Sequence, residues 1–339
     1  MAPPGPIGII ANPASGKDVR RLIARASVID NAEKRAIVRR ALAGVAATSA
    51  AAALAYYDDP HGIVRGGIAD SGHFADAVPV PVSTTGSALD TEAAAGELRR
   101  LGCVALVTLG GDGTNRVVTR AWPDAPLIPI STGTNNVFPH FLEATVAGAA
   151  AGLISSGLVG LAETARRHKR IHVDLDADSD LALVDAVLSE ERFVGSRALL
   201  EPDLLRRILL TRAEPAAVGM TAVGGLLMPL GSDEGAGALL ELGSGQGSVT
   251  LTVPIAPGHY RPVQVRAWRR VSFGEIIEFR GPGVLAFDGE RERVLPPSAG
   301  ARLTVSRDGP WVVDVHRALA LGAERSGFRR DQLTHSVSS

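Results

Sequence analysis

The feature that most constrains the fold of this chain is an apolar run that ends in a glycine-rich turn. Residues 104–108 are apolar or β-branched, which predicts a buried strand, and the sequence LGGDGTN follows at residues 109–115. Because glycine lacks a Cβ atom, backbone amides in such a turn can approach an anion such as a phosphate. The carboxylate of Asp112 at the tip is suited to take a proton from a hydroxyl or to hold Mg²⁺. A turn with both properties favours a kinase.

Strand and helix patterns alternate through the first half of the chain. We expect strands at residues 7–11, 78–82, 104–109 and 127–130, and helices at residues 19–55, 90–101, 115–121 and 143–156. The Gly-rich stretch 63–77 is predicted to be a loop or an irregular strand, and Asp90 or Thr91 is predicted to cap the helix that ends at residue 101. This alternation predicts a parallel sheet that is covered by helices on both faces and binds ligands at the carboxyl ends of its strands.

The second half contains mostly short β-rich runs separated by Gly and Pro, which predict an antiparallel β domain. The expected strands are residues 170–174, 182–188, 249–253, 263–267, 276–280, 284–287, 301–306 and 311–315. Residues 201–210 are the helix candidate of this half, and residues 231–247 are expected to form a mobile loop. We therefore expect a Rossmann-like α/β nucleotide-binding domain over residues 1–140, a β-rich substrate domain over 141–316, and a tail over 317–339 that packs back on the first domain.

Composition limits the classes of function. The chain has 339 residues, and its formal net charge of -1 argues against a broad surface for nucleic acid or for an anionic membrane. The lone cysteine, Cys103, excludes an intrachain disulfide and a thiolate zinc cage, and we interpret it as a small core residue. The first residues lack a signal-peptide pattern, and the alanine-rich stretch 41–55 is too short and too weakly apolar to span a membrane. These features predict a cytoplasmic protein.

Two further polar turns follow predicted strands. The sequence NPASGK at residues 12–17 either faces a phosphate through its amides and polar side chains or is an ordinary strand-to-helix loop. It is not a Walker A loop, because Asp18 stands where that loop has Ser or Thr and no glycine lies five residues before Gly16. The sequence TGTNN at residues 132–136 offers hydroxyls and amides for the same purpose, or is an Asn-rich turn.

Acidic residues gather at two places in the second half. The sequence FDGE at residues 287–290 predicts a β-hairpin turn, from which Glu290 could reach a cleft between the domains. Aspartates alternate along the chain at Asp174, Asp176, Asp178 and Asp180. The residues that follow lack the Gly and Glu of a calcium loop, so we interpret this run as a solvated acidic turn.

Together these motifs resemble the ATP–NAD kinase superfamily, which also includes diacylglycerol and sphingosine kinases. The glycine turn 110–114 is similar to the signature of that superfamily, residues 12–16 to its N-terminal nucleotide motif, and residues 133–136 to its third motif. The resemblance is closer still to the acetoin-catabolism X protein branch and covers nearly the whole chain. It implies an N-terminal α/β domain and a C-terminal antiparallel β domain of the NAD kinase and diacylglycerol kinase type, with the site between them.

The resemblance also implies roles for individual residues. Asp112 would be the base or activator for the 2′-hydroxyl of the adenosine ribose in NAD, and it is the candidate ligand for Mg²⁺. The nucleotide and its phosphates would be bound by Asn12, Ser15, Gly16, Gly110, Gly111, Gly113, Thr114, Asn115, Thr132, Gly133, Thr134, Asn135 and Asn136. The acceptor substrate would be bound by Asp185, Thr221, Ala222, Asp288 and Glu290. ATP is the implied phosphoryl donor, with polyphosphate as the alternative, and a homo-oligomer is the implied assembly.

One departure from the family pattern bears on the acceptor. NAD kinases carry an Asn–acid pair where this chain has Val184 and Asp185, and valine offers no hydrogen bond to the dinucleotide. A polar group left unpaired in this way costs roughly 1–3 kcal/mol. Three hypotheses follow. The leading one is a Mg²⁺- and ATP-dependent kinase that phosphorylates NAD; the others are a kinase for another small alcohol of acetoin or diol catabolism, and a nucleotide sensor without catalytic activity.

Overall fold

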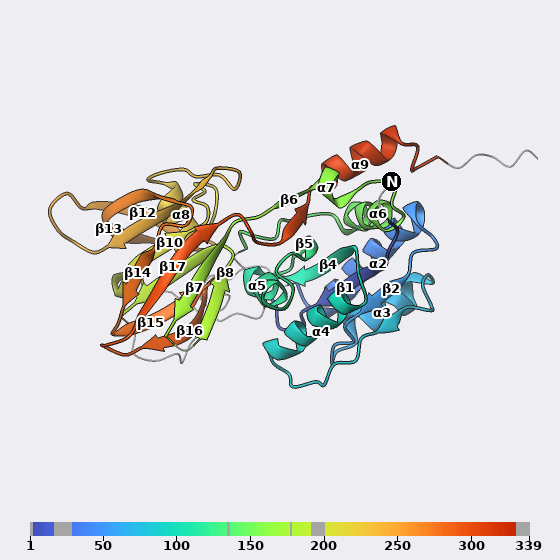
Figure 1. Ribbon diagram of the computed structural model, residues 1–339, viewed down its shortest axis with the longest axis horizontal. Helices are drawn as coiled ribbons and strands as arrows, with labels where there is room; N and C mark the ends of the chain where they lie inside the picture. The colour runs from blue at the N-terminus through green and yellow to red at the C-terminus, as the bar shows by residue number, and fades with distance from the viewer. Residues whose placement is uncertain (1–2, 17–28, 134–135, 177, 191–200, 330–339) are drawn as a thin grey trace, which may run out of the picture.

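The computed structural model describes residues 3–16, 29–133, 136–176, 178–190 and 201–329, which form two units side by side (Figure 1). The first unit is built on a seven-stranded sheet of order β3-β2-β1-β4-β5-β18-β6. Its strands are β1 (Ile7–Ala11), β2 (Leu54–Tyr56), β3 (Val78–Pro79), β4 (Ala105–Gly110), β5 (Pro126–Ser131), β6 (Ala165–Arg167) and β18 (Trp311–Val313). Neighbouring strands are parallel except for β6, which is antiparallel to β18. The predicted parallel sheet is therefore confirmed.

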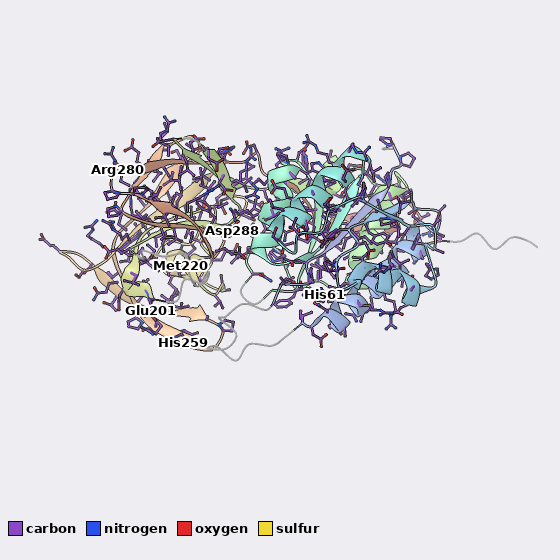
Figure 2. The ribbon with its side chains drawn as sticks, turned by 90° about the horizontal axis from the view of Figure 1, so that it is seen from below. His61, Glu201, Met220, His259, Arg280 and Asp288 are labelled. Carbon is purple, nitrogen blue, oxygen red and sulfur yellow. The ribbon has the colours of Figure 1, made fainter. Side chains whose placement is uncertain are left out.

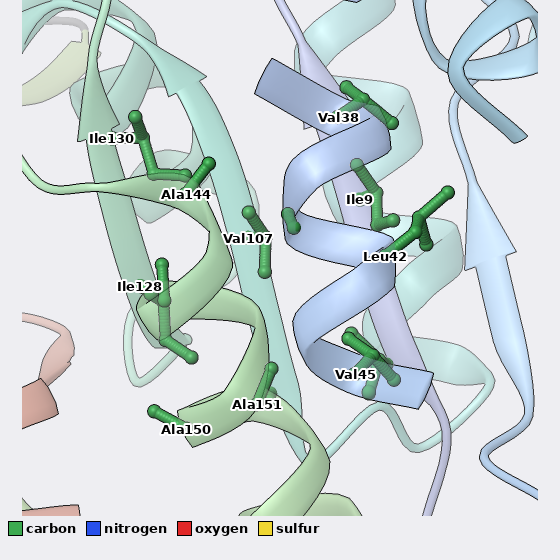
Figure 3. Close-up of a cluster of buried hydrophobic side chains, with 14 of the residues drawn as sticks. Ile9, Val38, Leu42, Val45, Val107, Ile128, Ile130, Ala144, Ala150 and Ala151 are labelled. Atoms are coloured by element: carbon green, nitrogen blue, oxygen red, sulfur yellow. The ribbon is translucent and has the colours of Figure 1, made fainter. Parts of the chain in front are cut away.

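Helices cover both faces of this sheet. They are α2 (Asn31–Thr48), α3 (Ile63–Ser71), α4 (Ala88–Arg100), α5 (Asp112–Ala121), α6 (Ala144–Ser155), α7 (Leu161–Thr164) and α9 (Val315–Glu324). Apolar side chains of α2, α3, α6 and α9 pack on one face of the strands, where Val38 and Leu42 of α2 lie near Ile9 of β1 (Figure 3). Helices α4 and α5 cover the opposite face through residues such as Leu98 and Val118.

Helices α2 and α6 approach each other so closely that only glycine fits at their contact. A Cβ atom on Gly148 would lie 1.8 Å from the carbonyl oxygen of Ala41, and one on Gly44 would lie 1.9 Å from that of Thr145. Small residues therefore replace large side chains in this part of the core, which explains how the unit packs densely although aromatics are only 4% of the chain.

The second unit consists of two antiparallel sheets. One has the strand order β12-β13-β11-β10-β9-β15-β16 and the other β14-β17-β7-β8. Their strands are β7 (Arg170–Leu175), β8 (Asp178–Ala182), β9 (Asp185–Ser189), β10 (Leu205–Leu210), β11 (Ala236–Leu242), β12 (Val249–Ala256), β13 (His259–Ser272), β14 (Ile277–Arg280), β15 (Gly283–Phe287), β16 (Glu290–Leu295) and β17 (Gly300–Ser306). Side chains such as Val173 and Leu285 fill the space between the sheets, and the short helix α8 (Met220–Gly225) covers the outer face of the larger one. The expected antiparallel β domain is confirmed.

The chain passes between the units twice, and the two connecting segments lie together. The amide of His168 donates to the carbonyl of Pro310 at 2.9 Å, and the amide of Gly309 donates to the carbonyl of His168 at 3.0 Å. The boundary expected at residue 140 falls before α6, α7 and β6, yet these elements pack with the first sheet. Helix α9 also returns to the first unit, where it packs on α6.

Several local predictions were wrong because tertiary pairing overrides local propensity. Residues 201–210, the helix candidate, contain β10, which pairs with β9 and β11 in the middle of the larger sheet. Residues 231–247, the expected loop, contain β11 in the same sheet. The predicted strand 182–188 is interrupted, because β8 and β9 belong to different sheets.

The first unit also departs from expectation in places. Helix α3 occupies much of the stretch 63–77 that was predicted to be irregular, and β2 begins within the last two residues of the predicted helix 19–55. Residues 19–28 of that predicted helix lie outside the described residues. The cap of α4 is Ser87 rather than Asp90 or Thr91, since the Ser87 hydroxyl accepts from the amide of Leu89. Among the helices that the structure describes, none combines the length and apolarity that crossing a membrane requires.

Candidate active site

Three polar turns meet at the carboxyl edge of the first sheet, as predicted. Strand register pairs Ala11 with Leu109 and Gly110 with Ser131, so the turns after β1, β4 and β5 begin side by side. The Asn12 side chain donates to the Thr114 hydroxyl at 2.8 Å, and the Ser15 and Thr132 hydroxyls share a hydrogen bond of 2.8 Å. The turns are thus bonded to one another, which fixes the position of their backbone amides.

The buried Lys34 stabilises the first turn, residues 12–15, through hydrogen bonds to its carbonyl oxygens. Lys34, in the first turns of α2, has no exposed surface, and its Nζ donates to the carbonyl oxygens of Asn12 and Ser15, each at 2.9 Å. The ammonium group therefore fixes the path of residues 12–15 and places a positive charge at the edge where the three turns meet. Sequence reasoning missed Lys34, because a lysine in a charged helical stretch gives the pattern of a solvent-exposed face.

The glycine turn leads directly into α5. Gly111 is the N-cap of this helix and contributes no side chain to its first amides, which leaves the positive end of the helix dipole accessible to an anion. A Cβ atom on Gly110 would lie 2.4 Å from the Cβ of Thr114, so a larger residue could not make this turn. The helix begins at Asp112, three residues earlier than predicted.

Asp112 is the most perturbed acid of this edge. Its side chain is buried, and its Oδ1 accepts hydrogen bonds from the amides of Phe138 at 2.8 Å and Val137 at 3.1 Å. Among the described residues, the Oδ2 atom accepts only from the amide of Val137, at 3.1 Å, a bond that both oxygens share. Burial raises the pKa of this carboxyl to about 7, the charge of Asp288 adds to the rise, and the two amides oppose it. A carboxyl group with this pKa can exchange a proton near neutral pH.

The β15–β16 hairpin brings a second buried carboxylate to the junction of the units (Figure 2). Asp288 and Gly289 both have positive φ angles, 50° and 80°, as the predicted hairpin turn requires. The Asp288 carboxylate accepts from the amides of Leu183, Val184 and Asp185 at 2.9, 2.7 and 3.2 Å. Burial raises its pKa to about 6, and the charge of Arg116 opposes the rise. Asp288 therefore binds the corner between β8 and β9.

Two arginines cross the junction in opposite directions. Arg116 of α5 donates to the carbonyl of Leu181 at 2.8 Å and to the Asp180 carboxylate at 3.0 Å, and its guanidinium lies 5.2 Å from the ring centre of Phe287. Arg212, which follows β10, donates to the carbonyl of Val137 in the first unit at 3.3 Å. Asp180 was expected in a solvated turn, but its carboxylate is buried because it pairs with Arg116.

Other predicted residues serve the turns themselves or lie apart from them. Asn115 is buried, and its side chain accepts from the Thr108 hydroxyl at 2.8 Å and donates to the carbonyl of Gly111 at 2.9 Å. Asn136 donates to the Ser131 hydroxyl at 2.7 Å. Thr134 and Asn135 lie outside the described residues. These contacts occupy the side chains with internal bonds, so the backbone amides are the groups left to meet phosphates.

The expected substrate residues come from three elements of the second unit. Glu290 lies against the glycine turn, since a Cβ atom on Gly113 would be 3.3 Å from its Oε1. Asp185 begins β9 and is buried. Thr221 and Ala222 lie in α8, and the buried Thr221 hydroxyl has no hydrogen-bond partner among the described residues.

The described residues do not form a metal cage of their own. No cluster of three or more His, Cys, Asp or Glu side chains in this part of the chain is arranged to hold a metal ion. Mg²⁺ is commonly bound by one or two carboxylates together with substrate phosphates.

Comparison with known proteins divides the chain as the fold does. The ATP-NAD kinase N-terminal domain matches residues 7–158, and the acetoin catabolism protein X C-terminal domain matches residues 169–308. Yeast NADH kinase, solved in complex with NADH, superposes with a TM-score of 0.54 at 14% sequence identity, over 98% of this chain and 91% of that chain. A diacylglycerol kinase from Bacillus anthracis gives a TM-score of 0.43 at 14% identity, over 91% and 96% of the two chains.

The fold is therefore of the NAD kinase type. Acetoin catabolism protein X from Cupriavidus necator is 37% identical to this chain over 324 residues, which are 91% of this chain and 90% of that protein. The chain belongs to the acetoin catabolism protein X family, and the resemblance found from its motifs is confirmed.

Proposed function

We propose that this protein is an ATP-dependent kinase that phosphorylates a hydroxyl group of a small substrate, with NAD as the leading acceptor. The observation that carries the proposal is Asp112, a buried carboxylate at the start of α5 whose Oδ2, among the described residues, accepts only one shared amide. Its pKa of about 7 suits a base that removes a proton from a hydroxyl at neutral pH. The similarity to yeast NADH kinase supports a dinucleotide acceptor.

In the proposed reaction, the acceptor oxygen attacks the γ-phosphorus of ATP while its proton moves to Asp112. The bond between this phosphorus and the bridging oxygen of ADP breaks, so the products are ADP and the phosphorylated acceptor, and Asp112 later releases the proton to water. Amides of the glycine turn and the N-terminus of α5 would bind the phosphates. Mg²⁺ would enter as part of the MgATP substrate and neutralise phosphate charge.

A second candidate is a kinase for a different small hydroxyl compound, and Val184 favours it. The Val184 side chain is fully buried among apolar residues that include Leu183, and its amide is occupied by Asp288. Position 184 therefore cannot supply the polar contact that an asparagine would give to a dinucleotide, and Asp185 is left as the acceptor contact at this corner.

The test is an assay of purified protein with MgATP and NAD, in which NADP is detected by a dehydrogenase that accepts only NADP. We expect NADP formation by the wild type. In Asp112→Asn, turnover should fall by on the order of 10²–10⁴-fold while ATP binding, measured by calorimetry, changes little. The same protein is then assayed for ADP release with a panel of small alcohols and diols.

Asp308→Asn is the matched control. Asp308 follows β17, and its carboxylate also has several partners, but these, including Arg170 at 2.7 Å, lie on β7 and β17 of the four-stranded sheet. It should keep wild-type turnover. ADP release with an alcohol but no NADP would favour the second candidate. ATP binding without phosphoryl transfer to any acceptor would leave the nucleotide sensor, and turnover near wild type in Asp112→Asn would remove Asp112 from the mechanism.

A further inference from the structure

The peptide group between Val137 and Phe138 is bonded at both of its ends. Its N–H, on Phe138, donates to Oδ1 of Asp112 at 2.8 Å. Its carbonyl oxygen, on Val137, accepts from Nη1 of Arg212 at 3.3 Å. The N–H and C=O of a trans peptide are coplanar and point in opposite directions. A cation and a carboxylate are therefore connected through one amide dipole that crosses the junction between the units.

Arg212 is held in place by groups on three sides. The residue is buried, Nη2 lies 3.1 Å from Nδ1 of His168, and the Glu214 carboxylate lies 3.6 Å from Nη1. Because a guanidinium can only donate, Nδ1 of His168 must be the acceptor. Burial lowers the pKa of His168 to about 3, helped by the charge of Arg212, so the imidazole is neutral.

His168 contacts both Phe138 and Arg212, the residues on either side of the same peptide. Its ring packs edge-on against the Phe138 ring, with centroids 5.4 Å apart and planes at 74°. Phe138 is thus held through its side chain by His168 and through its amide by Asp112, while Arg212 bonds both His168 and Val137. These contacts together fix the orientation of Arg212, His168 and the Val137–Phe138 peptide.

A positive charge at the carbonyl end of an amide strengthens hydrogen-bond donation from its N–H end, and it does so most in a buried, low-dielectric setting. Arg212 therefore strengthens the bond that orients Oδ1 of Asp112. It also attracts the Asp112 carboxylate directly, which opposes the rise in the pKa of that group. Neither action requires Arg212 to touch a substrate.

We propose that Arg212 is a positioning residue for Asp112, acting through the Val137–Phe138 peptide to hold the carboxylate in the orientation that receives a proton. The proposal rests on the proposed kinase function. It assigns to the second unit a side chain that controls the reactive group of the first, so the geometry at Asp112 depends on how the two units are docked.

The test compares Arg212→Met, Arg212→Lys and a control, Arg207→Met. Arg207 lies on β10, donates to the carbonyl of Glu278 and stacks on Phe279. None of these contacts involves the Val137–Phe138 peptide. In Arg212→Met we expect kcat to fall on the order of 100-fold, with KM and the ATP dissociation constant changed less than about threefold. Arg212→Lys should lie between wild type and Arg212→Met, because it keeps the charge but loses the planar fork. Arg207→Met should keep kcat.

Hydrogen exchange provides a readout that does not need turnover. In Arg212→Met the Phe138 amide should exchange faster than in the wild type, whereas Arg207→Met should leave it unchanged. If the wild type has no kinase activity, the proposed function fails but this exchange result still tests the peptide connection. Unchanged exchange, an unchanged kcat, or an ATP affinity that falls in parallel with kcat would overturn the proposal. Should Arg212→Met not fold, the Lys variant carries the same comparisons.

Discussion

The glycine turn of the first unit and the β15–β16 hairpin of the second both bring a buried aspartate to the junction, but they surround it differently. In the hairpin, three amides donate to Oδ1 of Asp288, the shortest bond being 2.7 Å, and one of them, from Leu183, lies closer to Oδ2, at 2.9 Å. In the glycine turn, two amides donate to Asp112, and its Oδ2 only shares the Val137 amide at 3.1 Å. Burial raises the pKa of both groups.

The difference shows that burial and a raised pKa do not by themselves mark a reactive acid. Asp288 uses both oxygens to bind the backbone of residues 183–185, so a substrate would have to displace these bonds. In Asp112, by contrast, Oδ2 accepts only a shared hydrogen bond of 3.1 Å among the described residues, and it lies beside the N-terminal amides of α5. The number and closeness of the amide donors around each carboxylate therefore separate a structural group from a candidate base.

The largest effect that sharpens this comparison is the pH dependence of the rate. If ionised Asp112 is the base, kcat/KM should rise with pH and level off above about 7, and at pH 5 it should be about 100-fold below the plateau. In Asp288→Asn the rise should shift to lower pH, because the like charge that raises the pKa of Asp112 is gone. Initial rates from pH 5 to 9 check this. A rise that does not move in this variant would mean that the two carboxylates do not interact.

The next effect is on the free energy of unfolding, which should differ between Asp288→Ala and Asp288→Asn. Asp288→Ala leaves the amides of Leu183, Val184 and Asp185 without an acceptor, which should lower the free energy of unfolding by about 3 kcal/mol or more. Asp288→Asn keeps an acceptor oxygen and should cost much less. Urea unfolding at pH 7 measures both variants. Equal losses would contradict the assignment of these amide bonds as the main role of Asp288.

The pH dependence of stability should show both carboxylates together. Their pKa values in the folded state, about 7 and about 6, lie above the usual 3.8, so the folded state holds these protons more tightly than the unfolded state. Their contribution to stability is fully present below about pH 4 and is lost as the pH rises through 6 to 7. The double variant with Asn at both positions should therefore lose less stability than the wild type between pH 4 and 8. Parallel curves for the two proteins in urea unfolding would refute this.

The smallest effects concern the glycines of the two turns. Gly289 has a φ of 80°, so Gly289→Ala should cost about 1 kcal/mol of unfolding free energy through backbone strain. Gly113→Ala meets only the end of the Glu290 side chain, at 3.3 Å, and should cost less because that side chain can move. Thermal unfolding of both variants ranks them. The reverse order would show that Glu290 is held rigidly against the glycine turn.

Much of the first unit follows from local sequence. Apolar runs before polar turns predict β1, β4 and β5, and the rule that ligands bind at strand carboxyl ends is enough to place their turns together at one edge. The predictions failed where pairing partners lie far away in the chain. Residues 205–210 have an apolar pattern that suits a helix, but their two neighbouring strands make them a central strand.

The candidate site was predicted only in part for a similar reason. Asp112 and its glycines carry a local signal, whereas Lys34, Arg116 and Arg212 carry none, because each is defined by a carbonyl or carboxylate that is distant in sequence. Side chains such as Asn115 and Asn136 were predicted to bind nucleotide, and in the fold they form hydrogen bonds with Thr108 of β4 and Ser131 of β5. Polar residue types in a turn indicate a site, but only the fold shows which atoms are already occupied.

The paired connecting segments at His168 and Pro310 have a consequence for synthesis of the chain. The second unit is inserted between β6 and β18, so the first sheet lacks one interior strand until residue 313 has left the ribosome. During translation β5 therefore lacks its neighbour β18 along one edge of the first sheet until the whole second unit has been synthesised. β18 and α9, which complete the first unit, are synthesised only after the whole second unit.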